Sequence, residues 1–191
     1  MKQPPLYFPE KFPTLETERL LLRETIDSDA AHLFELRSSE QTMHYLDLEP
    51  WKEKKEAQER IVDMVKWFKK KEAIQWAISL KGSSEQIGLV CLLRMKKENF
   101  RTEIGYMINP TYQRKGIALE AVTKIIDYAF NTMHFHSIEA NINPLNTPSI
   151  ILCEKAGFIK EAHFKENHFF RDTFYDTAIY SKLNPSHQPK Y

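Results

Sequence analysis

The sequence feature that most constrains the fold is a nearly unbroken apolar segment, QIGLVCLLRM, at residues 86–95. A strand with one buried face alternates apolar and polar residues, whereas a continuous apolar run is typical of a central strand covered on both faces. The segments IQWAISL at 74–80 and TEIGYMI at 102–108 also have strand character. The apolar segment therefore predicts the middle of a sheet that has cover on both sides.

Two long helices with one apolar stripe each are predicted over residues 54–71 and 116–130. The residues at helical spacing are Ala57, Ile61, Met64, Val65 and Phe68 in the first, and Ala118, Ala121, Val122, Ile125, Ile126, Ala129 and Phe130 in the second. A helix within DSDAAHLFELRSS, residues 27–39, begins with N-cap residues. A short helix within NTPSIILCEKA, residues 146–156, is closed by Gly157.

The remaining strands are expected at ERLLLRETI, residues 18–26, at HSIEANI, residues 136–142, and in a closing hairpin of about 158–164 and 171–181. This order predicts one α+β domain with a mixed sheet over residues 15–183. Residues 1–14 are rich in proline and predict an extended arm, and residues 184–191 predict a polar tail.

Composition narrows the functional classes. The chain has 191 residues, 42% of them hydrophobic, and a formal net charge of +1, so no basic excess indicates nucleic acid binding. No apolar run has the roughly 18–20 residues that a membrane span needs. The two cysteines, Cys91 and Cys153, make neither a disulfide framework nor a metal-ligand pattern. A cytoplasmic protein without a metal, a membrane partner or a nucleic acid partner is expected.

The segment QRKGIA, residues 113–118, lies between a strand end and a helix start. The first N–H groups of a helix have no internal partner and carry about half a positive charge, which favours an anion such as a phosphate. Arg114 and Lys115 add charge, and Gly116 permits a close approach to the backbone. The glycine patterns of nucleotide-binding loops are absent. The alternative is a loop that only turns the chain into the helix.

Several motifs in order resemble the GNAT acyltransferase superfamily. They are Gln113-x-x-Gly116-x-Ala118 after the strand EIGYMINP, then Asn146-x-x-Ser149, then EKAGF. Within that superfamily, the segments LETERLLLRE, EIGYMI and YDTAIYSKL are similar to the ribosomal-protein N-terminal acetyltransferase (RimJ/RimL) group. The resemblance extends over about residues 15–183.

The resemblance implies a three-layer αβα fold whose mixed, mostly antiparallel sheet splays apart at an acetyl-CoA cleft. The pyrophosphate would lie on the backbone amides of residues 114–118. The pantetheine arm would pair with the strand end at Met107 and Ile108, where the N–H of one of these two residues would face the thioester carbonyl. A lysine in the later helix would reach the terminal phosphates or would be an ordinary surface lysine. The expected coenzyme contacts are Met107, Ile108, Gln113, Arg114, Lys115, Gly116, Ile117, Ala118, Asn146 and Lys155.

The implied reaction is direct transfer of an acetyl group from the thioester to an amine, which needs a base for the amine and an acid for the thiolate. Glu103 is the candidate base, since alternation puts Glu103, Gly105 and Met107 on one face of their strand. The alternative is an exposed glutamate held in a salt bridge.

The candidate acid is Ser149. Where many members of the superfamily have a tyrosine, this chain has Cys153, and Ser149 lies one helical turn earlier on the same face. The RimJ/RimL group is similar in using serine there. The alternatives are a small polar residue in the first turn for Ser149 and a small buried hydrophobic residue for Cys153.

The acceptor is expected to be a primary amine, including the N-terminal α-amino group of a ribosomal protein. It would be bound by the early helices, the loop MHYLDLEPW and the hairpin FKENHFFRDTFYD, which carries Glu166, Asp172 and Asp176. The alternatives are a polyamine, amino acid or aminoglycoside-like acceptor, or a catalytically silent acetyl-CoA-binding sensor. The aromatic edges leave a homodimer open.

Overall fold

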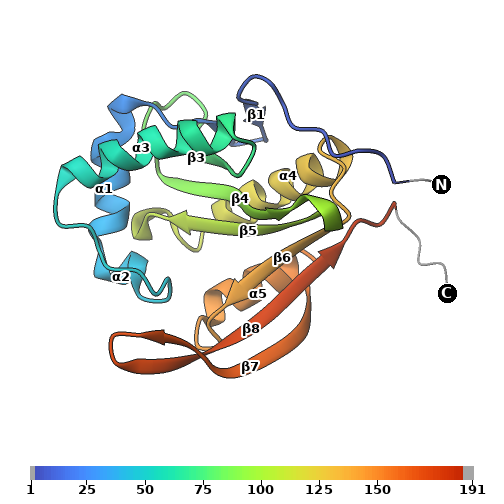
Figure 1. The fold of residues 1–191 in the computed structure, drawn as a ribbon. Coiled ribbons are helices and arrows are strands. Elements are labelled where there is room, and N and C mark those ends of the chain that lie inside the picture. Colours follow the sequence, from blue (N-terminus) through green and yellow to red (C-terminus); the bar gives the residue numbers. More distant parts are fainter. Residues whose placement is uncertain (1–2, 187–191) are drawn as a thin grey trace.

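The computed structural model describes residues 3–186, and an eight-stranded sheet forms its centre (Figure 1). The strand order is β1-β2-β3-β4-β5-β6-β8-β7, and every neighbouring pair is antiparallel except β5 and β6. The strands are β1 (Leu15–Glu16), β2 (Leu20–Glu24), β3 (Ile74–Leu80), β4 (Gly88–Lys96), β5 (Arg101–Ile108), β6 (Ser137–Ile142), β7 (Ile159–Phe170) and β8 (Thr173–Leu183).

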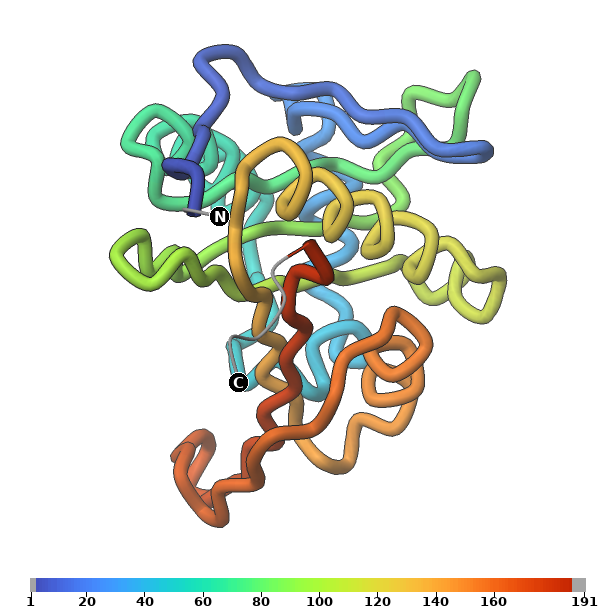
Figure 2. Tube along the Cα trace, turned by 90° about the vertical axis from the view of Figure 1, so that its right-hand side faces the viewer, coloured from blue at the N-terminus to red at the C-terminus, as the bar shows by residue number. Residues whose placement is uncertain are grey.

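Helices cover both faces of the sheet, which confirms the three-layer arrangement expected from the sequence. The helices are α1 (Ala30–Ser38), α2 (Glu40–Met43), α3 (Lys54–Lys69), α4 (Ile117–Asn131) and α5 (Thr147–Lys155). In Figure 2 the yellow helix α4 lies toward the viewer, in front of the green strands. Within residues 3–186, no helix has both the length and the apolar character that crossing a bilayer would need.

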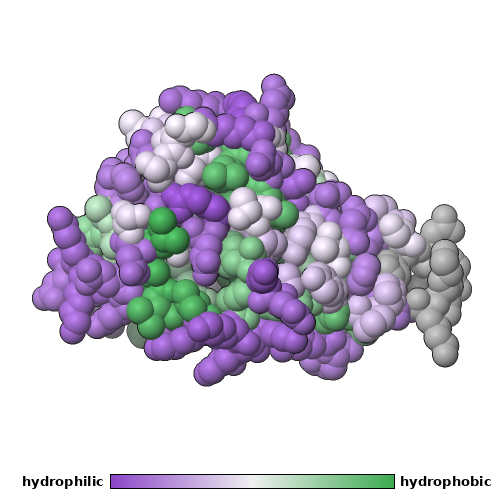
Figure 3. All heavy atoms as spheres, turned by 90° about the horizontal axis from the view of Figure 1, so that it is seen from above, coloured by the Kyte–Doolittle hydropathy of each residue, from purple (hydrophilic) through white to green (hydrophobic). Residues whose placement is uncertain are grey.

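Two clusters of buried side chains lie on the two faces of the sheet. One contains α4 residues together with Trp76, Ile104 and Ile108. The other contains α1 and α3 residues together with Leu89 and Met107. The outer side of α3 is polar, and the view from above in Figure 3 shows a mostly hydrophilic surface with small hydrophobic patches. The alternation of side chains predicted for the strand at residues 102–108 is thus confirmed.

The parallel pair β5–β6 separates partway along its length. The strands pair at Arg101–Ser137, Thr102–Ile138 and Glu103–Glu139, but β5 continues to Ile108 and β6 to Ile142. Figure 1 shows the two arrows diverging beyond this point. The splayed sheet expected from the family resemblance is present, and its apex lies at Glu103.

The closing hairpin is longer than the sequence predicted. The first strand was expected to end at about Phe164, but β7 continues to Phe170. The pairing with β8 persists through irregularities near Lys160 and between Phe164 and His168, which absorb the extra residues. Since β8 pairs with β6 only up to Ala178, the distal half of the hairpin extends beyond the sheet.

Both ends of the described chain are attached to the core. The indole N–H of Trp76 donates a hydrogen bond to the carbonyl of Pro13 over 2.8 Å, so the extended arm packs against the sheet. Asn184, the first residue of the expected polar tail, is buried and donates to the carbonyl of Phe135 over 3.2 Å. Residues 187–191 of that tail lie outside the described residues.

Candidate active site

The edge of β5 that faces β6 presents backbone groups where the two strands separate. The N–H of Asn109 donates to the carbonyl of Ile87, on the β4 side, over 2.9 Å. Because N–H directions alternate along a strand, the N–H of Met107 also points toward β4, whereas those of Tyr106 and Ile108 point toward β6. Of the two residues considered from the sequence for an N–H facing the cleft, the backbone direction selects Ile108.

The loop between β5 and α4 has the backbone shape of an anion site. Arg114 and Gly116 have φ angles of 61° and 76°, and Gly116 is the N-cap of α4 without a side-chain cap. The first N–H groups of α4 therefore have no capping side chain, and Arg114 and Lys115 are exposed beside them. Gln113 stabilises the start of this loop, because its side-chain amide donates a hydrogen bond to the carbonyl of Ile108 over 3.1 Å.

Glu120 adds a negative charge to the first turn of α4, and neighbouring groups neutralise it. Arg19 forms a salt bridge with it at 2.6 Å, and Thr17 donates a hydrogen bond over 2.5 Å. Burial disfavours the charged form, but these hydrogen bonds outweigh burial and lower the pKa of Glu120. Arg19 also donates a hydrogen bond to the carbonyl of Lys115 over 3.0 Å. The same side chain therefore stabilises both the loop and the Glu120 carboxylate.

Ser149 lies in a cluster of three polar side chains between β5 and α5. Its Oγ is 2.6 Å from the Tyr106 hydroxyl, which is 3.5 Å from the Sγ of the fully buried Cys153. Burial, with Cys153 nearby, raises the pKa of the Tyr106 phenol, so this group keeps its proton at neutral pH. Burial also raises the pKa of the Cys153 thiol. Asn146 caps α5 by accepting the Ser149 N–H over 3.2 Å.

Tyr106 was not identified as a site residue from the sequence. Its partner Ser149 is 43 positions away, and only the packing of α5 against the sheet brings the two together. The alternation that placed Tyr106 opposite Glu103 on the strand was the available signal. Phenol and serine hydroxyl together form a proton-bearing pair beside the open edge of β5.

Glu103 lies at the apex of the splayed strands, and both of its carboxylate oxygens accept hydrogen bonds. Arg94 contacts the two carboxylate oxygens at 3.0 and 2.9 Å, and the Asn141 side chain donates over 2.7 Å. The Glu103 side chain is 14% exposed, whereas that of Arg94 is 69% exposed. The salt bridge considered as the alternative from the sequence is therefore present, although the carboxylate is mostly buried rather than exposed.

The loop and the hairpin expected to bind the acceptor meet in the structure. Arg171, at the hairpin tip, forms two hydrogen bonds with the Glu49 carboxylate at 2.9 and 2.6 Å. His168 lies 3.7 Å from Asp47 in the same loop. Of the hairpin acids, Asp176 is already bound by His163 and by a backbone N–H. The hairpin tip thus forms a bridge to the segment between α2 and α3.

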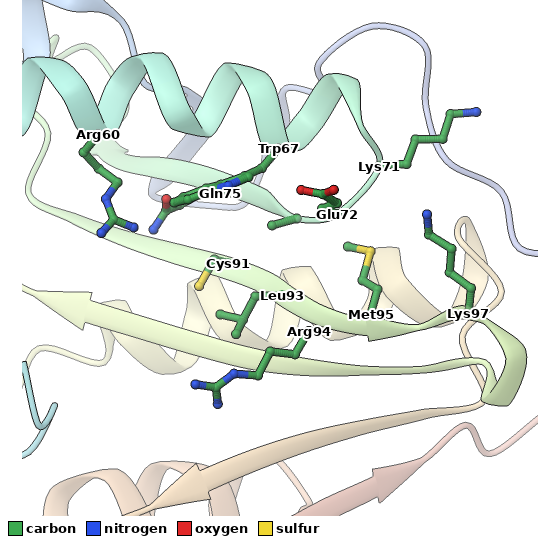
Figure 4. Close-up of a pocket in the computed structure, with 11 residues that line it drawn as sticks. Arg60, Trp67, Lys71, Glu72, Gln75, Cys91, Leu93, Arg94, Met95 and Lys97 are labelled. Carbon is green, nitrogen blue, oxygen red and sulfur yellow. The ribbon is translucent and has the colours of Figure 1, made fainter.

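A pocket of about 480 Å³ lies between α3 and the sheet (Figure 4). Its wall includes Cys91, Leu93 and Arg94 from β4, and Arg60 and Trp67 from α3. In the sheet, Cys91 pairs with Gly105 and Leu93 pairs with Glu103, so this pocket adjoins the part of β5 where the cleft opens.

Arg60 was also missed from the sequence. It lies three residues after Ala57 and four before Met64, both buried on the apolar stripe of α3, and this spacing was the available signal. Lys155 is exposed in the last turn of α5, where a cation is favourable, and its proposed contact with the coenzyme stays a prediction. No group of three or more histidine, cysteine, aspartate or glutamate side chains suited to a metal ion occurs in the described part of the chain.

Comparisons with known proteins agree with these features. Residues 19–159 match the family model described as "Acetyltransferase (GNAT) domain". The protein named "Uncharacterized N-acetyltransferase YoaA" of Bacillus subtilis (strain 168) is 33% identical over 174 residues, which are 91% of this chain and 98% of that protein. The "[Ribosomal protein uS5]-alanine N-acetyltransferase" of Escherichia coli (strain K12) is 27% identical over 184 residues, covering 92% of this chain and 93% of that protein.

The fold itself also has solved relatives. The crystal structure of spermidine N-acetyltransferase from Vibrio cholerae in complex with CoA and spermine superposes with a TM-score of 0.78. The identity is 24%, and the match covers 88% of this chain and 97% of that one.

Proposed function

Because this chain belongs to the GNAT acetyltransferase family, we propose that it moves an acetyl group to a primary amine by direct attack within a ternary complex. Acetyl-CoA is the co-substrate of this N-acetyltransferase. The observation that carries the proposal is the loss of β5–β6 pairing after Glu103, beside a helix start whose N–H groups have no capping side chain. An added strand and an anion fit such an edge and such a helix start.

The pyrophosphate of the coenzyme is proposed to lie on the backbone amides of residues 114–118. The positive φ of Gly116 turns the backbone into α4, and the exposed Arg114 and Lys115 add positive charge. The pantetheine arm is proposed to follow the open edge of β5, with Asn146 beside it. The N–H of Ile108 then faces the thioester carbonyl, where a fixed donor stabilises the developing oxyanion by about 3–4 kcal/mol.

Proton transfer is proposed to use both faces of β5. Glu103, on the α1–α3 face, takes a proton from the attacking ammonium directly or through water. Ser149, on the α5 face, gives a proton to the departing thiolate and regains one from Tyr106 or water. The support for this division is that the two side chains lie on opposite sides of the strand whose edge would hold the thioester.

A protein N-terminal α-amino group is the acceptor that we propose first. The likeness to the Escherichia coli enzyme named for the alanine of ribosomal protein uS5 supports it, because it extends over nearly the whole chain. A small amine is the second candidate, supported by the fold shared with a spermidine N-acetyltransferase.

Acetyl transfer from saturating acetyl-CoA to a panel of amines, read by product mass, tests the proposal. The panel contains peptides with free serine or alanine N-termini, polyamines, amino acids and aminoglycosides. Acetylation of one class supports the enzyme and names its acceptor. Coenzyme binding without any product, even in overnight reactions, would replace the enzyme with a catalytically silent sensor of acetyl-CoA.

A further inference from the structure

Three arginines from three elements lie near Cys91 on the α1–α3 face of the sheet. Arg60 of α3 and Arg94 of β4 both act on the charge of the Cys91 thiol, although burial dominates and raises its pKa to about 12. Arg37 of α1 is close to Arg60: burial, and then the positive charge of Arg60, lower the pKa of Arg37 to about 10. Figure 4 shows Arg60 reaching from α3 toward the strand that carries Cys91.

Two of these arginines have no carboxylate partner in the described part of the chain. Arg94 is paired with Glu103, but neither Arg37 nor Arg60 forms an ion pair or a side-chain hydrogen bond with any other residue from 3 to 186. Each guanidinium instead lies over a tryptophan ring, Arg37 over Trp51 and Arg60 over Trp67, both at 5.0 Å from the ring centre. The Nε atom of Arg37 is buried without an acceptor.

Holding these arginines in this position without a ligand lowers the stability of the fold. Two like charges lie close together in a partly dry space, and a buried donor lacks its hydrogen bond. Glu56 is close enough to act on Arg37, but its carboxylate already accepts the backbone N–H groups of residues 52 and 53. Within residues 3–186 neither guanidinium therefore has a carboxylate hydrogen-bonded to it, and an anion in the adjacent pocket, which Arg60 lines, would relieve the repulsion between the two charges.

The adjacent pocket has the charge that this anion requires. Four cationic side chains line it, and one anionic side chain does: Arg60, Lys71, Arg94 and Lys97 against Glu72. The apolar part of the wall comes from Trp67, Leu93 and Met95. Because Leu93 pairs with Glu103 and Cys91 with Gly105, the pocket begins beside the proposed position of the reacting amine.

We infer that the acceptor amine carries a carboxylate. Arg60 binds this carboxylate in the pocket under α3, and the nearby Arg37 adds positive charge. This inference rests on the proposed acetyl transfer. A planar guanidinium binds a carboxylate with two parallel hydrogen bonds, which also orients the ligand. The carboxylate comes from an acidic residue next to a peptide N-terminus or from the α-carboxylate of a free amino acid. Polyamines and aminoglycosides, which are cationic throughout, are poor acceptors for this site.

Matched acceptors distinguish these sources. One series consists of serine-led tripeptide amides whose second residue is aspartate, asparagine or lysine. The other compares free alanine with alaninamide, and spermidine is added as a polycation. Since a hydrogen bond between charged groups is about twice as strong as a neutral one, we expect kcat/KM to be at least about tenfold higher for the carboxylate member of one series than for its neutral amide.

Two variants of α3 test the residue assignment. Arg60→Gln is expected to abolish the preference for the carboxylate, mainly through KM, with the Kd for acetyl-CoA unchanged. Lys55→Gln removes one positive charge from the exposed side of the same helix and is expected to keep the preference. A second readout is tryptophan fluorescence, since Trp51 and Trp67 lie against the arginines: an N-acetylated aspartyl peptide should change the signal of the wild type and not of Arg60→Gln.

The outcomes separate this inference from the proposed function. Equal kcat/KM values within both series, a preference for the lysyl peptide or spermidine, or identical behaviour of the two variants would overturn the carboxylate site and leave acetyl transfer intact. If no amine is acetylated, the proposed function fails, and the fluorescence titration decides on the anion site alone.

Discussion

Replacing Tyr106 with phenylalanine removes one hydroxyl from the proposed proton-donor pair and leaves the ring in place. The hydroxyl lies 2.6 Å from the Ser149 Oγ and 3.3 Å from the Ser149 carbonyl oxygen, so its loss frees Ser149 to rotate. Tyr106 and Ile108 face the same side of the sheet, and the phenyl ring still fills the space between β5 and α5. We therefore expect folding and coenzyme binding to be kept in Tyr106→Phe.

The size of the effect follows from this geometry. Leaving a buried partner without its hydrogen bond costs about 1–3 kcal/mol. Ser149 is partly exposed, so water replaces part of the lost contact, and the lower end, about 1 kcal/mol, applies. Because about 1.4 kcal/mol corresponds to a factor of ten in rate, Tyr106→Phe should slow acetyl transfer by about fivefold. Ser149→Ala removes the proposed acid itself and should slow it by about a hundredfold.

The double variant tests whether Tyr106 acts through Ser149. If it does, Tyr106→Phe has nothing further to remove once Ser149 is alanine, and the double variant is as slow as Ser149→Ala alone. The assay is single-turnover release of free CoA thiol, titrated with a disulfide reagent, together with the Kd for acetyl-CoA. The buried thiols of Cys91 and Cys153 are expected to stay unreactive while the protein is folded.

Three results would refute this reasoning. If the double variant is slowed by the product of the two single-variant factors, the tyrosine and the serine act independently. A larger loss in Tyr106→Phe than in Ser149→Ala would make the phenol the direct proton donor. An unchanged rate in both single variants would move the proton source to water.

Three further predictions concern the loop, a buried ion pair and alkaline stability. Gly116→Ala and Gly82→Ala, both at positive φ, should each lower the free energy of unfolding by about 1 kcal/mol, but only Gly116→Ala should raise the Kd for acetyl-CoA; equal Kd values would contradict the loop assignment. Asp29→Ala should cost about 3 kcal/mol in urea unfolding, since it leaves Arg23 unpaired in a mostly buried site, and a loss below about 1 kcal/mol would contradict this. Because the pKa of Cys91 rises from 9.0 to about 12 on folding, stability is complete below pH 9 and falls as the pH rises toward 12, by up to about 1.4 kcal/mol per pH unit. Urea unfolding at pH 8 and 10.5 measures this fall, which should be smaller in Cys91→Ala.

The elements that the sequence predicted well are those whose signal is local. The apolar run at residues 86–95 becomes β4, whose first five residues are all buried. The stripe over 116–130 becomes α4, Ile117–Asn131, and the glycine before it takes the positive φ that only glycine adopts without strain. In each case the relevant residues lie within one or two turns or within one strand, so their spacing alone contains the information.

The side-chain groupings of the site depend on packing between distant elements. Tyr106 meets Ser149 only because α5 lies against β5, and Arg37 approaches Arg60 only because α1 packs on α3. The hairpin tip reaches the loop after α2 through Arg171 and Glu49, which are 122 positions apart. Spacing along the chain cannot indicate such contacts. A salt bridge or a hydrogen bond between distant residues produces no repeating pattern in the sequence around either residue.

One strand orders all the proposed chemistry of this site. Side chains of β5 alternate between the two faces of the sheet, and its N–H groups alternate between the two edges. Glu103 therefore lies on the face of the arginine pocket, Tyr106 lies on the face of Ser149, and the N–H of Ile108 points to the open edge between them. A shift of one residue in the β4–β5 register would exchange both faces at once. Gly105 fits the observed register, in which it pairs with Cys91, because a Cβ at position 105 would lie only 3.0 Å from the Cys91 Sγ. The observed register, which a small residue at position 105 permits, thus keeps the proposed base, the proposed proton donor and the proposed oxyanion donor in their separate directions.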